Sequence, residues 1–343
     1  MEHFTGAQSS PVRHASSEGA PAAPFRGARR AALLFVLALL LWQFCFPHQA
    51  AFARQPDADA PAPGAGGKEI NAIAGLSDGK VSSASRLFIL AVGINEYKNP
   101  KMTLRYGRSD AESFVRAVEQ HGKKIFSQVV KQTIYDGQAV RGTIEDAFQR
   151  VISEAGPEDV FVFYYAGHGV LSREDAGKKA EFYMALSDVT RLSGDHGMLE
   201  ERGLSARFLR ELSTLVKARK QLLVLDACHS GGALDNFSLG AHTEGKAVHQ
   251  MTKGLDITVL TAAGASQSAT EFRQLGHGVF TFALLKGLAG EADGGPSPDG
   301  TITVKELVSY LNVKVPELTR QYKGAVQNPN SFARGEDFPL GAR

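Results

Sequence analysis

The chain has 343 residues, of which 43% are hydrophobic and 22% are charged, and this composition is typical of a globular protein with a sizeable core. Its formal net charge at pH 7 is only +2, and no block of like charges interrupts the sequence. This balance argues against a nucleic-acid-binding protein that works through a basic face.

The N-terminal region has the features of an export signal. Residues 1–30 are polar and end in arginines, residues 31–42 form an uninterrupted apolar segment, and Ala51-Phe52-Ala53 matches an A-x-A cleavage site. The apolar segment is shorter than the ~20 residues of a membrane span. We therefore predict a signal peptide over residues 1–53 and a periplasmic or secreted protein. The long polar leader leaves an uncleaved signal anchor as the alternative, and only in that case would the chain be attached to a membrane.

A composition change after the signal marks a linker. Residues 54–85 are rich in Ala, Pro, Gly and Asp, cannot bury much apolar surface and are predicted to be flexible. A single folded domain is expected over residues 86–335, followed by a C-terminal tail at 336–343.

Within that domain, predicted strands alternate with predicted helices. Short apolar runs bounded by turn residues indicate buried strands, and apolar residues at helical spacing indicate helices that cover them. The first helix would be capped by Ser109 or Asp110, and the last opens with a capping box at Thr303 and Glu306. The alternation predicts an α/β domain with a largely parallel sheet flanked by helices. Strands are expected at 87–94, 129–135, 160–165, 182–186, 222–225 and 257–262, helices at 110–120, 143–153, 205–216, 279–288 and 303–313, and polar loops at 187–204 and 234–254.

Two strands deliver chemically reactive side chains at their carboxyl ends. The segment 220–232, KQLLVLDACHSGG, is an apolar run followed by Asp226 and Cys228, and the segment 159–169, DVFVFYYAGHG, delivers His168 between two glycines. In open parallel sheets, ligands bind beyond the carboxyl ends of the strands. A thiol and an imidazole presented in this way suit a nucleophile and its base.

Cysteine usage strengthens this interpretation. The two cysteines are Cys45 and Cys228, so removal of the signal peptide would leave Cys228 without an intramolecular partner. His168 would hold the thiol deprotonated near neutral pH, and the N–H groups of Gly169 and Cys228 could form an oxyanion hole. The alternative is a buried core thiol and an unrelated loop histidine. One cysteine in the folded part is too few for a zinc site, and no cofactor motif is present, so neither metal nor cofactor is predicted.

The motifs YYAGHG (164–169) and DACHSGG (226–232) resemble the His and Cys motifs of caspase-like cysteine peptidases, and they are closer to the metacaspase and bacterial branch than to animal caspases. Asp226 stands where animal caspases have Gln, and His229 follows the cysteine. The resemblance runs from about Arg86 to Asn330. It also includes LFILAVGINEY (87–97), LRYGRSDAESF (104–114) and GHGVFTFALLKGL (276–288).

The resemblance implies a caspase-like three-layer sandwich and a cysteine endopeptidase with Cys228 as nucleophile and His168 as general base. The family's third contributor is a backbone carbonyl, so no third side chain is named. Asp110 matches an acidic residue that lines the primary pocket of metacaspases, and Asp226, two residues before Cys228, should point toward the same pocket. Two carboxylates would favour Arg or Lys before the scissile bond. A helix N-cap is the alternative role of Asp110. Ala166 replaces the Ser that metacaspases often carry two residues before the His.

Partners and regulation follow from the same interpretation. The expected partners are protein or peptide substrates, and no nucleic acid. Some metacaspases need calcium, but the sequence shows no calcium site here, so calcium dependence stays open. Lys246 and Lys253 in the 234–254 loop are conceivable self-cleavage points, although a solvated linker is the simpler account. The rival function is a catalytically silent caspase-fold module that binds a protein partner.

Overall fold

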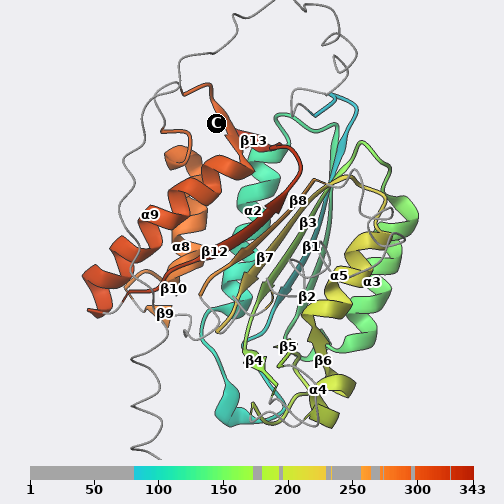
Figure 1. Cartoon of the computed structure of the whole chain (residues 1–343), viewed down its shortest axis with the longest axis vertical. Helices are drawn as coiled ribbons and strands as arrows, with labels where there is room; N and C mark the ends of the chain where they lie inside the picture. Colours follow the sequence, from blue (N-terminus) through green and yellow to red (C-terminus); the bar gives the residue numbers. More distant parts are fainter. Residues whose placement is uncertain are drawn as a thin grey trace, which may run out of the picture. The chain divides into compact units, whose positions relative to one another are not determined.

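A computed structural model describes residues 81–172, 180–192, 196–228, 233, 256–263, 271–272, 274–294, 298–324 and 326–343. Its centre is a six-stranded sheet with the order β12-β8-β7-β3-β1-β2 (Figure 1). Five strands of this sheet (β1, β2, β3, β7 and β8) run parallel, and β12 pairs antiparallel with β8 at one edge. The strands are β1 (Arg86–Gly93), β2 (Gln128–Tyr135), β3 (Val160–Ala166), β7 (Lys220–Asp226), β8 (Asp256–Thr261) and β12 (Asn330–Arg334).

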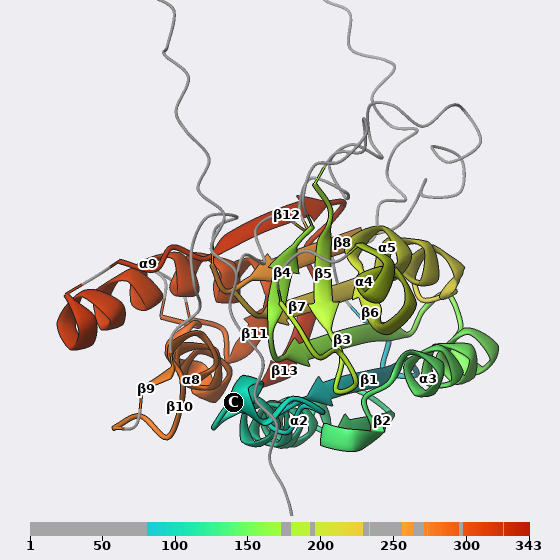
Figure 2. The ribbon, with the colours of Figure 1, turned by 90° about the horizontal axis from the view of Figure 1, so that it is seen from below.

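Helices cover both faces of this sheet (Figure 2). On one face lie α2 (Gly107–Gly122), α8 (Val279–Lys286) and α9 (Val304–Lys323), and on the other lie α3 (Arg141–Glu154) and α5 (Ala206–Leu215). Shorter helical segments are η2 (Pro100–Met102), η3 (Asp136–Gln138), α4 (His196–Arg202) and the π-helical turn η5 (Gly287–Glu291) that extends α8.

The alternation of side chains along β1 explains the two hydrophobic layers. Residues 88, 90 and 92 pack with α3 and α5, whereas residues 87, 89 and 91 pack with α2, α8 and α9. Every residue of β3 and β7 is buried, as expected for central parallel strands. The predicted α/β three-layer sandwich with a mostly parallel sheet is thus confirmed.

Smaller sheets complete the domain. The first, β4-β5-β6, lies beyond the carboxyl end of β3, and two-stranded pairs form from β9 with β10 and from β11 with β13. The expected polar loop at 187–204 was wrong in part, because it contains α4 and β6. The domain also continues beyond 335, because β13 in the expected tail pairs with β11. The strands are β4 (Gly169–Leu171), β5 (Phe182–Ala185), β6 (Gly203–Ser205), β9 (Glu271–Phe272), β10 (His277–Gly278), β11 (Thr301–Thr303) and β13 (Pro339–Ala342).

Helices α2 and α9 differ most from their predicted bounds. Helix α2 begins three residues earlier, with Tyr106 at the N-cap, so neither Ser109 nor Asp110 caps it. Helix α9 has the predicted capping box but runs through Pro316 and ends ten residues later than expected. Its buried side chains Val315 and Leu318, which flank the proline, keep it packed on the domain.

Several predictions fall outside the described residues. These are the signal peptide, most of the linker, and the 234–254 loop with Lys246 and Lys253. Within the described ranges, none of the helices has both the length and the apolar character needed to cross a membrane.

Candidate active site

His168 and Cys228 lie at the same edge of the central sheet. Strands β3 and β7 pair in parallel, with Ala166 opposite Asp226, and each reactive residue follows two positions later. The N–H of Gly167 donates to the carbonyl of Asp226 at 3.2 Å, which continues the pairing beyond the strands. The two predicted catalytic residues are therefore carried on adjoining strand ends.

Gly169 brings the two segments into backbone contact. A Cβ atom at this position would overlap the carbonyl oxygen of Cys228 and would lie 2.7 Å from a ring carbon of Phe182. Only glycine lets the chain after His168 approach Cys228 so closely. The two N–H groups predicted for the oxyanion hole thus belong to residues whose backbones are in contact.

The imidazole of His168 is oriented by a main-chain acceptor. Its Nε2 atom lies 2.8 Å from the carbonyl oxygen of Met102, the last residue of η2. A carbonyl can only accept, so Nε2 carries the proton and, in the neutral ring, Nδ1 keeps its lone pair. The ring is half-buried, and the bond fixes the tautomer in which Nδ1 can act as a base.

Two tyrosines hold the backbone of His168. Its N–H donates to the hydroxyl of Tyr97 at 2.8 Å, and the Tyr97 ring lies 5.0 Å from the imidazole. Its carbonyl oxygen lies 2.8 Å from the hydroxyl of Tyr165 and accepts from the N–H of Ala185. His168 is consequently restrained on both sides of the peptide and at the ring.

The same tyrosines interact electrostatically with Cys228, whose side chain is partly accessible. Burial raises the pKa of Tyr97, and a thiolate at Cys228 would raise it further. Burial likewise raises the pKa of Tyr165, with contributions from Tyr97 and Cys228. Both hydroxyls therefore stay protonated, and they lie within electrostatic range of the thiol.

Asp110 lies in the first turn of α2, and its carboxylate faces β10. One oxygen is 2.5 Å from Nδ1 of His277, and the other accepts from the N–H of Gly278 at 3.0 Å. The Asp110 side chain is only 4% exposed. The carboxylate thus links the start of α2 to a segment 167 residues away in the sequence.

Asp226, at the end of β7, is bound by the same C-terminal segment. Thr281 in α8 donates to its carboxylate at 2.6 Å, and the hydroxyl of Tyr164 lies 2.5 Å from the Thr281 oxygen. Burial raises the pKa of Tyr164, and the charges of Asp226 and Asp110 raise it further. Both predicted pocket acids therefore lie near one buried hydroxyl, beneath residues 277–281.

Sequence reasoning did not identify four of these contributors: Tyr97, the Met102 carbonyl, His277 and Thr281. A signal existed for His277, because Gly276-His277-Gly278 repeats the Gly-His-Gly pattern around His168. No group of three or more His, Cys, Asp or Glu side chains suited to a metal ion occurs among the residues that the structure describes.

An α/β sandwich that carries a thiol and an imidazole on neighbouring strand ends has the architecture of a thiol-dependent hydrolase. A family model for the caspase domain of peptidase family C14 matches residues 86–334, which is more than half of the chain. The chain therefore belongs to the caspase-like peptidase family.

Two further proteins are similar to parts of this chain. Metacaspase-1 of Schizosaccharomyces pombe (strain 972) is 28% identical over 153 residues, which covers 43% of this chain and 34% of that protein. The chain thus matches about a third of the length of that relative. The crystal structure of protein GSU0716 from Geobacter sulfurreducens has 18% identity and a TM-score of 0.49, and the match covers 73% of this chain and 94% of that one.

Proposed function

We propose that this protein is an exported cysteine endopeptidase that hydrolyses peptide bonds through Cys228 and His168. The observation that supports it most directly is the hydrogen bond between Nε2 of His168 and the Met102 carbonyl, because it leaves Nδ1 as the basic atom of the ring. The family membership and the adjoining strand ends support the same assignment.

In the proposed reaction, Nδ1 of His168 accepts the proton of the Cys228 thiol, and the thiolate attacks the scissile carbonyl carbon. The oxyanion receives hydrogen bonds from the N–H groups of Gly169 and Cys228. The imidazolium then donates its proton to the leaving amine, and a thioester remains on Cys228. Water, deprotonated by His168, attacks the thioester, releases the acid and restores the thiol.

We further propose cleavage after Arg or Lys. Asp226 lies two residues before the nucleophile, and Asp110 contributes a second negative charge near Tyr164. Two carboxylates with few exposed atoms give a strong local negative potential, which favours a cationic substrate side chain and disfavours an acidic one. The hydrogen bonds to Thr281 and His277 fix the orientation of these acids.

The test uses purified full-length protein and fluorogenic peptides with Arg, Lys or Asp before the scissile bond, with and without calcium. We expect Arg and Lys peptides to be cleaved, and Cys228→Ala to abolish cleavage. Asp226→Asn should lower kcat/KM for the Arg peptide by about 10-fold or more, because it removes one pocket charge. Asp146→Asn, at an exposed position in α3, is the matched control.

Other outcomes would revise the proposal. Preferential cleavage after Asp would keep the peptidase but contradict the charged pocket. No cleavage of any peptide, together with alkylation of Cys228 no faster than that of free cysteine, would favour the silent binding module. Export is a separate proposal, and N-terminal sequencing of the mature protein would test cleavage after Ala53.

A further inference from the structure

Asp136 stands at the start of η3, directly after β2, with an unusual backbone conformation. Its φ of 47° is the only positive φ of a non-glycine residue among those the structure describes. Such angles are uncommon outside glycine and cluster at functional positions. Because β1 and β2 pair with Gly93 opposite Tyr135, this residue lies beside the chain as it leaves β1.

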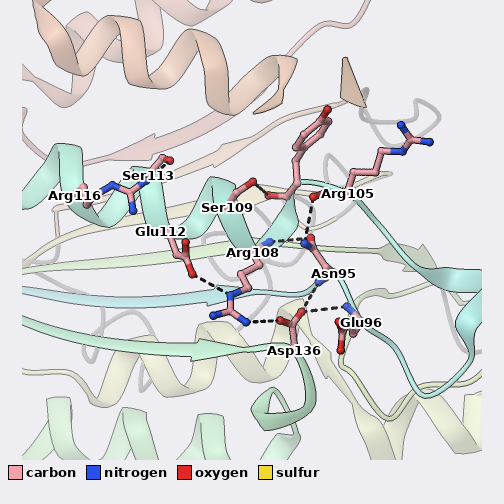
Figure 3. Close-up of polar contacts among 10 residues, drawn as sticks. Asn95, Glu96, Arg105, Arg108, Ser109, Glu112, Ser113, Arg116 and Asp136 are labelled. Carbon is pink, nitrogen blue, oxygen red and sulfur yellow. Dashed lines mark hydrogen bonds and ion pairs between the residues drawn. The ribbon is translucent and has the colours of Figure 1, made fainter. Parts of the chain in front are cut away.

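The carboxylate of Asp136 binds the start of the loop that joins β1 to α2, residues 94–106, which we call the β1–α2 loop (Figure 3). One oxygen accepts from the N–H groups of Asn95 at 2.8 Å and Glu96 at 3.1 Å. The other accepts from the guanidinium of Arg108 at 3.1 Å. The Asp136 side chain is only 14% exposed, so water competes weakly for these bonds.

Asn95 then closes the β1–α2 loop on itself. Its carbonyl accepts from the N–H of Leu104 at 2.9 Å, and its side-chain oxygen accepts from the N–H of Arg108 at 3.0 Å. Its side-chain amide donates to the carbonyl of Arg105 at 3.2 Å (Figure 3). The two ends of the loop are therefore tied together at one residue, which Asp136 holds.

The closed loop carries both groups that orient the imidazole. Tyr97 follows directly after Glu96, and Met102 precedes Leu104 by two residues. From these positions the Tyr97 hydroxyl accepts the backbone N–H of His168, and the Met102 carbonyl lies 2.8 Å from Nε2. Displacement of the loop would move both acceptors together.

We propose that Asp136 is a positioning residue for the catalytic histidine, acting through the β1–α2 loop. This inference rests on the proposed Cys228 and His168 pair. Without the carboxylate, the loop loses the hydrogen bonds at Asn95 and Glu96, and the Met102 carbonyl no longer holds a single ring orientation. A misplacement of about 1 Å can lower a rate by about 100-fold, so the effect on catalysis should exceed the effect on folding.

Asp159 provides a matched control at the opposite end of the sheet. Its carboxylate also accepts from two backbone N–H groups, those of Arg86 and Gly156, and from the Arg86 guanidinium. Its side chain is 8% exposed. It precedes β3, whereas the active site follows that strand. Loss of either carboxylate should therefore cost similar stability, but only one change should disturb the histidine.

The experiment uses full-length protein with Cys45→Ser, so that Cys228 is the only thiol. Asp136→Gly and Asp159→Gly remove the same group, and glycine tolerates the positive φ at position 136. We would measure kcat and KM with the cleaved peptide, and the iodoacetamide rate at Cys228 across pH. We expect Asp136→Gly to lower kcat and the alkylation rate by about 10-fold or more, with KM little changed.

The pH profile separates positioning from simple destabilisation. Loss of the Met102 acceptor makes the imidazolium less favourable, so the rising limb of alkylation should move to higher pH in Asp136→Gly and stay in place in Asp159→Gly. Asp136→Asn can still accept both N–H groups and tolerates the same φ, so it should recover activity to within about 3-fold. Asn95→Ala opens the loop from its other side and should reproduce the loss if the glycine variant fails to fold.

Equal effects of the two glycine variants, or an unchanged pH profile with Asp136→Gly, would overturn the inference. These results differ from failure of the proposed function, in which the parent protein itself neither cleaves peptides nor alkylates faster than free cysteine. In that case there is no catalytic pair to position, and the inference fails with it.

Discussion

Replacement of Thr281 by valine tests the hydrogen-bond chain beneath the proposed pocket. Thr281 is fully buried, donates to Asp226 at 2.6 Å and lies 2.5 Å from the hydroxyl of Tyr164. Valine keeps the shape but removes the hydroxyl, so a buried carboxylate loses a donor and a buried tyrosine loses its acceptor. Loss of these two partners should lower the free energy of unfolding by about 2–5 kcal/mol.

The assay is urea denaturation of the full-length protein near neutral pH, with unfolding monitored by circular dichroism. Thr281→Ser is the control, because it keeps the hydroxyl and loses one methyl group, at a cost of about 1 kcal/mol. The valine variant should therefore be the less stable of the two, with an unchanged dependence on urea concentration. A valine variant as stable as the parent protein, or more stable than the serine variant, would refute the hydrogen-bond chain from Tyr164 through Thr281 to Asp226. If these hydrogen bonds are present, the valine variant should also lose activity toward Arg peptides, because the orientation of the Asp226 carboxylate depends on Thr281.

Three further changes address other contacts. Tyr97→Phe removes the acceptor for the N–H of His168, so kcat should fall about 10-fold with KM little changed; an unchanged kcat would show that the ring alone suffices. Gly169→Ala forces a methyl group against a backbone carbonyl and should abolish peptide cleavage, whereas Gly142→Ala, in open space, should leave it intact. For Asp159, burial raises the pKa, but an arginine and two backbone amides lower it more, to a net value below 3.8. Because the pKa of Asp159 is lower in the folded state than in the unfolded chain, the ionised carboxylate stabilises the fold at any pH above the unfolded-state pKa. This contribution is lost as the pH falls through the folded-state pKa. The difference in free energy of unfolding between the parent protein and Asp159→Asn, measured by urea denaturation, should be constant between about pH 5 and 7 and should become smaller below about pH 4. A difference that grows in acid would contradict the assigned contacts.

The central layers could be predicted because their sequence signals are local. Apolar runs identified the five parallel strands and the small β5, and helical spacing identified the covering helices, although their ends shifted by a few residues. The antiparallel edge strand β12 gave no such signal, since its exposure alternates and it has little apolar character. Helix α9 continued past the expected end because the burial of Val315 and Leu318 outweighs the one backbone bond that Pro316 removes.

Sequence patterns indicated candidate site residues only where a reactive side chain comes directly after a predicted strand. The segments that carry His168 and Cys228 could be expected at one edge of the sheet because parallel strands end there, and the catalytic roles of the two residues stay a prediction. The partners of the two acids could not, because His277 and Thr281 lie 167 and 55 residues from Asp110 and Asp226 in the sequence. Contacts of that separation depend on tertiary packing, which leaves no periodic trace in the chain.

The group that holds the imidazole belongs to the main chain, and this affects which mutations can disturb it. Every amino acid has a carbonyl, so no exchange at position 102 can delete the acceptor that Met102 supplies. A scan of single substitutions would therefore pass over one of the closest contacts of the proposed base. What the site cannot tolerate is a change in chain length between Asn95 and Leu104, since one residue more or fewer would put a different carbonyl, or none, beside the ring. In this part of the protein, the spacing of residues carries information that their identity does not.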